Sequence, residues 1–185
     1  CSFVKNILSQ QGITLQGKVC VGQLTSNSQI LSVHRAQPNS ELLKKILKSS
    51  NNVYADCLFK KAATTKNSPG TYEKGEFLLR NFLSNISGSN LFVIKDGSGR
   101  SHYNKLTPNF CAALLKEVTE KPYYAFLKNS LPIGGKDGTL RKRMKSIPGA
   151  VRAKTGILTG VSTLAGYVDS KDDTFAMAIF NDGFI

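Results

Sequence analysis

The chain has 185 residues, 41% of them hydrophobic and 20% charged, which is typical of one globular domain with a substantial core rather than a disordered chain. The net charge is +13, but the basic residues are dispersed and accompany no nucleic-acid-binding motif, so we expect a solvated basic face and no nucleic-acid partner. The apolar runs are too short to cross a bilayer and the four cysteines contain no C-x-x-C pair, so we expect no transmembrane segment, metal or cofactor.

The first part of the chain is predicted to be mainly helical. Apolar residues at helical spacing predict a helix near residues 2–12, and alternating patterns then predict strands over 18–24 and 29–36. An amphipathic helix follows within 38–50, with Ser40 as its expected cap. A short strand running into a glycine-rich turn is predicted over 91–99. Further helices are predicted over 53–63, 68–86, 107–118 (with Thr107 as cap) and 121–131.

The last 36 residues change character. Three strand-like segments, 150–156, 162–170 and 174–181, are joined by short connections, which favour an antiparallel meander over parallel crossovers. The expected fold class is therefore α+β, with helices packed on an antiparallel sheet. Because the chain opens at Cys1 inside a helical pattern and without an initiator Met, we expect it to be an incomplete piece of a longer protein.

Two polar motifs stand out from this scaffold. Ser50-x-Asn52 lies between two predicted helices, and Lys154-Thr155-Gly156 lies at a strand edge. Alone, each has an ordinary explanation, since Ser and Asn often cap helices and a Lys-Thr-Gly tripeptide occurs by chance. In this order, roughly a hundred residues apart, they match two of the three motifs of serine penicillin-recognising enzymes. Acyl transfer needs a proton shuttle and a cationic anchor for the substrate carboxylate, and these residue types supply both.

Four segments extend the match along residues 2–184: ILKSSNNVYAD, DGSGRSHYN, LPIGGKDGTLRKRM and AKTGILTGVSTLAGYV. Together they resemble the D-alanyl-D-alanine carboxypeptidase/endopeptidases of the class C, low-molecular-mass penicillin-binding proteins. The resemblance implies a β-lactamase/transpeptidase-like domain. It also implies a serine carboxypeptidase, with endopeptidase action as a further option, that cleaves peptidoglycan stem peptides through an acyl-enzyme and is acylated by β-lactams. A periplasmic or other extracytoplasmic location follows from that substrate.

The resemblance also implies roles for individual residues. Ser50 would relay protons to the leaving amine, and Asn52 would hydrogen-bond the substrate carbonyl and support the catalytic lysine. Lys154 and Thr155 would bind the terminal carboxylate of the peptide or of penicillin. Gly156 would leave room for the substrate backbone, and the backbone N–H of Ile157 would enter the oxyanion hole. The turns 96–99 and 135–138 would be structural.

The family pattern is broken in one place, because it requires an upstream S-x-x-K tetrad that supplies the nucleophile. The one literal match here, Ser2-Phe3-Val4-Lys5, falls where the family has an ordinary helix after the true tetrad. We therefore expect residues 1–185 to be the C-terminal part of the penicillin-binding domain, with the nucleophile-bearing N-terminal part absent and the fragment inactive alone.

Two alternatives remain open. A β-lactamase-type hydrolase would share the fold and the motifs but would need a base for deacylation, for which Glu73 and Glu76 are weak candidates. A non-catalytic, basic cell-wall-binding module would instead explain the missing tetrad and would bind through long-range charge attraction. Turnover of penicillin, and an S-x-x-K motif in the full gene product, would distinguish these alternatives.

Overall fold

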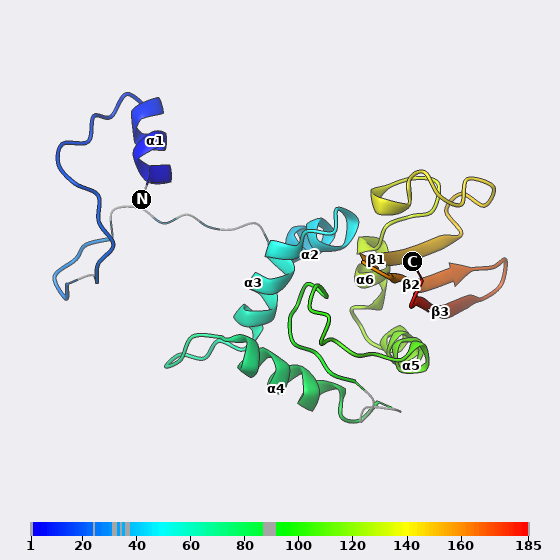
Figure 1. The fold of residues 1–185 in the computed structure, drawn as a ribbon. Coiled ribbons are helices and arrows are strands. Elements are labelled where there is room, and N and C mark those ends of the chain that lie inside the picture. Colours follow the sequence, from blue (N-terminus) through cyan, green and yellow to red (C-terminus); the bar gives the residue numbers. More distant parts are fainter. Residues whose placement is uncertain are drawn as a thin grey trace. The chain divides into compact units, whose positions relative to one another are not determined.

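The structure is a computed structural model that describes residues 2–23, 25–30, 33, 35, 38–86 and 92–184. The chain divides into two compact units, residues 1–36 and residues 37–185 (Figure 1). The first unit contains helix α1 (Ser2–Gln10), which ends at a turn where Gly12 has a positive φ of 74°. The second unit holds every other helix and strand of the described residues.

The strand predicted over 18–24 is wrong, because residues 18–23 form no strand. The same holds for the described residues of 29–36, whereas 31, 32, 34 and 36 lie outside the described residues. An alternating pattern becomes a strand only when a partner completes the ladder and covers the apolar side chains. Here Val21 and Ile30 are 92% and 83% exposed, so no such cover forms.

Five helices of the second unit confirm the helical pattern of the sequence, and none of the described helices is long and apolar enough to span a membrane. Polar caps begin three of them, since the side chains of Asn51, Thr71 and Thr107 each accept the backbone N–H three residues on. The predicted Ser40 cap is wrong. The helix begins at Asn39, one residue before Ser40, and its N-cap residue is Pro38, which makes no side-chain cap. The helices are α2 (Asn39–Lys48), α3 (Asn52–Ala62), α4 (Tyr72–Leu83), α5 (Pro108–Thr119) and α6 (Tyr124–Ser130).

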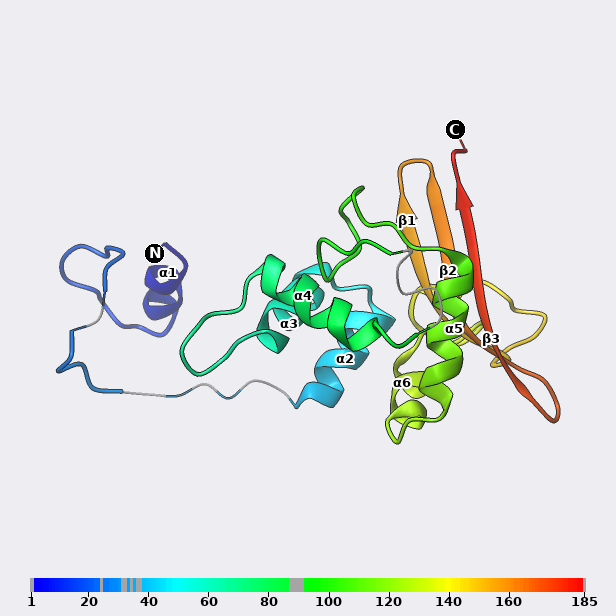
Figure 2. The same ribbon diagram turned by 90° about the horizontal axis from the view of Figure 1, so that it is seen from below.

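The sheet confirms the predicted α+β meander. Strands β1 (Val151–Leu158), β2 (Val161–Asp169) and β3 (Thr174–Asp182) pair antiparallel in the order β1-β2-β3. Helix α5 packs on β2 and β3, where the buried Tyr167 donates its hydroxyl to the carbonyl oxygen of Leu115 at 2.9 Å (Figure 2). The opposite face carries a core cluster of Leu140, Val151, Ala153 and Leu164.

A second core cluster joins α4 and α5 through Leu83, Phe92 and Phe110, and the rings of the two phenylalanines stack 4.9 Å apart. The strand predicted over 91–99 is wrong for residues 92–96, and Leu91 lies outside the described residues. Val93 makes one isolated bridge to Lys105, and no ladder extends from it. The Lys95 N–H is taken by the side-chain oxygen of Asn104 at 2.7 Å, and the backbone that follows turns around the carboxylate of Asp96, which accepts the N–H groups of Gly99 and Ser101.

Candidate active site

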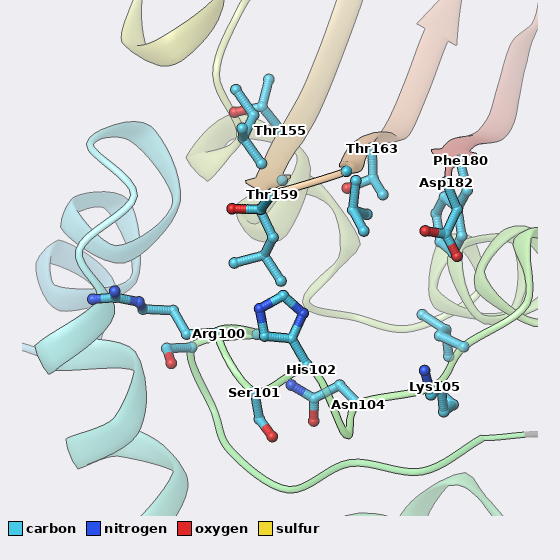
Figure 3. A pocket seen from close by; sticks show the side chains of 18 of the residues that line it. Arg100, Ser101, His102, Asn104, Lys105, Thr155, Thr159, Thr163, Phe180 and Asp182 are labelled. Carbon is cyan, nitrogen blue, oxygen red and sulfur yellow. The ribbon is translucent and has the colours of Figure 1, made fainter. Parts of the chain in front are cut away.

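A cleft of about 790 Å³ opens where the β1–β2 end of the sheet meets the beginning of α3 and the loop 98–106. The six residues that the sequence predicts for the site all line it: Ser50, Asn52, Lys154, Thr155, Gly156 and Ile157. Figure 3 shows the loop side chains, His102 among them, facing Thr159 and Thr163 at the ends of the strands. Two motifs far apart in the sequence therefore meet in one cavity.

Ser50 lies in the left-handed region of backbone space, with a φ of 55°. It follows the end of α2 in a Schellman arrangement, because the N–H of Asn51 donates to the carbonyl of Ile46 at 3.2 Å. Glycine is the usual residue at this position, since a Cβ there costs about 1 kcal/mol. A serine in a glycine position is a local violation of the kind that collects at functional sites.

The KSSNN segment contains a second, overlapping match to the S-x-N pattern, Ser49-x-Asn51, and the structure separates the two. The Ser49 hydroxyl donates back to the Lys45 carbonyl of its own helix at 2.6 Å. Asn51 caps α3 by accepting the N–H of Tyr54 at 3.0 Å. The structural roles thus fall to Ser49 and Asn51, which leaves Ser50 and Asn52 in the cleft.

Lys154 connects the two motifs. Its ammonium donates to the Ser50 hydroxyl at 2.8 Å and also to the backbone carbonyl of Thr155. Burial lowers the pKa of Lys154 from its ordinary value, because a partly desolvated ammonium is less stable. A cation held this way lacks a carboxylate partner among the described residues, so it is prepared to receive one from a ligand.

The rest of the Lys-Thr-Gly motif differs in detail from the expectation. The Thr155 hydroxyl donates to Thr139 at 3.0 Å, so it is anchored to the neighbouring loop although Thr155 lines the cleft. A Cβ on Gly156 would lie 2.4 Å from Oγ1 of Thr163, its partner on β2, so the Thr163 side chain occupies the space beside this glycine. The Ile157 side chain is 78% exposed, which leaves its backbone as the part that can act in the cleft.

The opposite wall of the cleft falls in the DGSGRSHYN segment of the family resemblance, for which the sequence predicts a structural turn at 96–99 and no site residue. Arg100, Ser101, His102, Asn104 and Lys105 line this wall and make it largely basic and polar. The signal in the sequence is the stretch GRSHYNK, where a run of mostly polar residues directly follows Gly99.

Two carboxylates shape this wall. Asp96 accepts the N–H groups of Gly99 at 2.6 Å and Ser101 at 2.7 Å. Asp56, one turn along α3 from Asn52, accepts the N–H groups of Gly97 and Ser98 at 2.9 and 3.0 Å. The loop is therefore fastened to the helix that begins with the S-x-N motif.

The literal tetrad match at Ser2 has a different setting. Ser2 begins α1 in the first unit, whereas all cleft-lining residues belong to the second unit. Among the described residues no group of three His, Cys, Asp or Glu side chains could hold a metal ion.

Residues 2–185 match the model of the D-Ala-D-Ala carboxypeptidase 3 (S13) family. The chain belongs to this family. It is 32% identical to the D-alanyl-D-alanine carboxypeptidase of Actinomadura sp. (strain R39), covering 95% of this chain and 35% of that protein. It is also 32% identical to the carboxypeptidase DacB of Haemophilus influenzae, covering 98% of this chain and 40% of that protein. The chain thus spans well under half of these curated relatives.

Solved structures agree with the family. The fold matches penicillin binding protein 4 of Haemophilus influenzae, solved in complex with a β-lactam, with a TM-score of 0.84 at 29% identity over 99% of this chain and 44% of that one. A predatory endopeptidase of Bdellovibrio bacteriovorus shares the fold at a TM-score of 0.61 and 22% identity. The expected β-lactamase/transpeptidase-like fold class is confirmed, with this chain covering part of it.

Proposed function

We propose that the protein carrying this chain is a serine-type D-Ala-D-Ala carboxypeptidase that acts on peptidoglycan stem peptides through an acyl-enzyme. The observation that carries the proposal is the contact between Ser50 and Lys154, 2.8 Å apart in a cleft that both motifs line. A serine held in a strained conformation against a partly buried ammonium, which has no carboxylate partner among the described residues, fits proton transfer beside an anion site.

In this proposal Lys154 holds the terminal carboxylate of the peptide, with Thr155 beside it. The nucleophile attacks the carbonyl of the penultimate D-Ala, and the developing oxyanion is stabilised by backbone N–H groups that include that of Ile157. Ser50 then passes a proton to the amine of the departing D-Ala, so that the peptide bond breaks as the acyl-enzyme forms. Water hydrolyses the acyl-enzyme and regenerates the nucleophile. Asn52 would orient the substrate carbonyl and the catalytic lysine of the tetrad.

The nucleophile in this scheme comes from a part of the protein outside residues 1–185. Family membership supports this division, because relatives share a serine-type reaction and this chain spans 35% and 40% of two of them. The chain alone should then bind no penicillin covalently and hydrolyse no D-Ala-D-Ala. β-Lactams and stem peptides are the ligands of the whole protein, which would work in the periplasm or elsewhere outside the cytoplasmic membrane. Endopeptidase action on cross-links is a further activity of the same site.

The β-lactamase alternative needs a carboxylate that activates water at the acyl-enzyme. Neither Glu73 nor Glu76 is among the residues that line the cleft. Glu76 is bound by Lys95 at 2.8 Å and by Arg80 at 3.2 Å, and these hydrogen bonds lower its pKa below the ordinary value despite opposing desolvation. An ionised carboxylate that is bound by two basic side chains and does not line the cleft favours a slowly deacylating penicillin-binding protein.

The test is intact-mass spectrometry after incubation with benzylpenicillin, on the full-length protein and on residues 1–185 in parallel. We expect one covalent adduct on the full-length protein and none on the short chain. An adduct mapped to Ser2 would show that the literal tetrad is the nucleophile. Rapid disappearance of the adduct with release of penicilloate would favour the β-lactamase. No adduct on either form would favour the basic wall-binding module, whose binding should weaken steeply with salt.

A further inference from the structure

Three consecutive residues, Asp137, Gly138 and Thr139, contact both halves of the candidate site. Asp137 accepts the ammonium of Lys48 at 2.5 Å, and Thr139 accepts the hydroxyl of Thr155 at 3.0 Å. Lys48 is the last residue of α2, two positions before Ser50. The segment 137–139 therefore touches the helix that ends at Ser50 and the strand that carries Lys154.

The contacts of Asp137 extend into β1. Its other carboxylate oxygen accepts the N–H of Ile133 at 2.8 Å. Around Ile133 the backbone pairs with the beginning of β1, since Ala153 N donates to Pro132 O at 3.0 Å and Gly134 N donates to Val151 O at 2.8 Å. The Asp137 carboxylate thus bonds the end of α2 directly, and through the backbone at 132–134 it is connected to Ala153, the residue before Lys154.

Gly138 completes the connection by its lack of a side chain. A Cβ there would lie 2.8 Å from the carbonyl oxygen of Lys48 and 3.0 Å from Cβ of Pro132, and its φ is +57°. The loop can approach the end of α2 this closely only with glycine. The Asp-Gly pair is thus suited to set the distance between helix and loop, beyond the plain turn expected from the sequence.

We propose that Asp137 is a positioning residue for the reaction: through Lys48 it holds Ser50 in register with Lys154. The inference rests on the proposed function, because it assigns Asp137 to the reaction that Ser50 and Lys154 would perform. The Lys48 and Asp137 side chains are 24% and 40% exposed, so the pair adds little to global stability. Its main effect is on geometry, where a displacement of about 1 Å can cost on the order of 100-fold in rate.

The experiment compares Lys48→Met with Lys44→Met in the full-length protein. Lys44 lies on the same helix and also forms an ion pair, with Glu41 at 2.9 Å, but that pair is exposed and remote from the loop. We expect Lys48→Met to lower kcat on a D-Ala-D-Ala peptide and the rate of acylation by benzylpenicillin about 10-fold, with KM nearly unchanged. Lys48→Arg should retain most of the activity, and Lys44→Met should match the wild type.

Asp137→Asn and the double variant with Lys48→Met complete a mutant cycle, in which the two losses should not add. Amide hydrogen exchange supplies a readout independent of activity: the N–H of Asn51, bonded to Ile46, should exchange faster in Lys48→Met and not in Lys44→Met. Equal rates and equal exchange in the two lysine variants would overturn the proposal. If the wild type forms no acyl-enzyme, the proposed function fails, and the exchange data alone then decide whether Asp137 positions Ser50.

Discussion

The Lys154 ammonium donates to the Ser50 hydroxyl at 2.8 Å, although the two residues are 104 positions apart in the chain. Lys154 is the fourth residue of β1, and Ser50 follows the end of α2 in a left-handed conformation. Their contact brings a hydroxyl to a partly buried cation in a cleft large enough for a peptide terminus.

Ser50→Gly should uncouple stability from activity. Glycine relieves the left-handed strain, so the free energy of unfolding should equal or exceed that of the wild type, and it should exceed that of Ser50→Ala by about 1 kcal/mol. Loss of the hydroxyl should lower kcat of the full-length protein by about 100-fold or more. Denaturant unfolding and steady-state kinetics measure the two effects.

Ser49→Ala is the matched control for Ser50. It removes the adjacent hydroxyl, which donates only to Lys45 within its own helix. The variant should keep near-wild-type kcat. If Ser49→Ala lost as much activity as Ser50→Gly, the functional serine of the segment would have been assigned to the wrong residue.

Lys154 should give the reaction an alkaline limit. Burial lowers its pKa below the ordinary lysine value of 10.5, so the free protein loses the ammonium at a lower pH than an exposed lysine would. Acylation by benzylpenicillin should fall as pH rises through that lowered pKa, and Lys154→Met should be slow at every pH. An alkaline limit no lower than that of an exposed lysine would contradict this.

The same shift has a consequence for stability, with a definite sign. Between the lowered pKa and 10.5 the unfolded chain binds more protons at Lys154 than the folded one, so stability rises with pH in that window. The free energy of unfolding of the wild type should therefore increase with pH relative to Lys154→Met. Urea titrations of the two proteins at a series of alkaline pH values test the sign directly.

Local signals predicted α5 and the sheet well. Thr107 followed by Pro108 marks a helix start by itself, and the connections between the three strands are too short for any arrangement but a meander. Patterns that need a distant partner failed. Residues 18–23 alternate but find no ladder, and after the isolated bridge of Val93 to Lys105 the N–H of Lys95 goes to the Asn104 side chain.

The site was predictable as a set of residue types and not as a geometry. The motifs placed Ser50 and Lys154 together, but the left-handed backbone at Ser50 depends on how α2 ends, and no nearby glycine announced it. Asp56 could not be predicted, because a carboxylate in an amphipathic helix is typical of a solvent-exposed face. Its role depends on the N–H groups of Gly97 and Ser98, which only the tertiary fold brings to it.

Asp56→Ala should loosen the loop wall of the cleft. It leaves the N–H groups of Gly97 and Ser98 without their acceptor, which should speed their hydrogen exchange and lower stability by about 1–3 kcal/mol. Asp56→Asn keeps an acceptor oxygen in the same place and should restore much of the loss. Equal exchange in the Ala and Asn variants would show that α3 does not hold the loop.

Gly166→Ala should destabilise the pairing of β2 with β1, the strand that carries Lys154. A Cβ at position 166 would lie 2.2 Å from the carbonyl oxygen of Arg152 and 2.6 Å from Cα of Ala153, both of them backbone atoms of β1. Because backbone cannot move aside as a flexible side chain can, β1 must shift away from β2, which should cost about 3 kcal/mol or more. Gly22→Ala is the control, since a Cβ there meets nothing within 4 Å. Thermal unfolding should show a large loss of Tm for the first variant and almost none for the second.

Because Ala153 immediately precedes Lys154, acylation by benzylpenicillin should also slow in whatever fraction of Gly166→Ala remains folded. A folded variant with wild-type acylation would show that the function of Lys154 tolerates movement of β1.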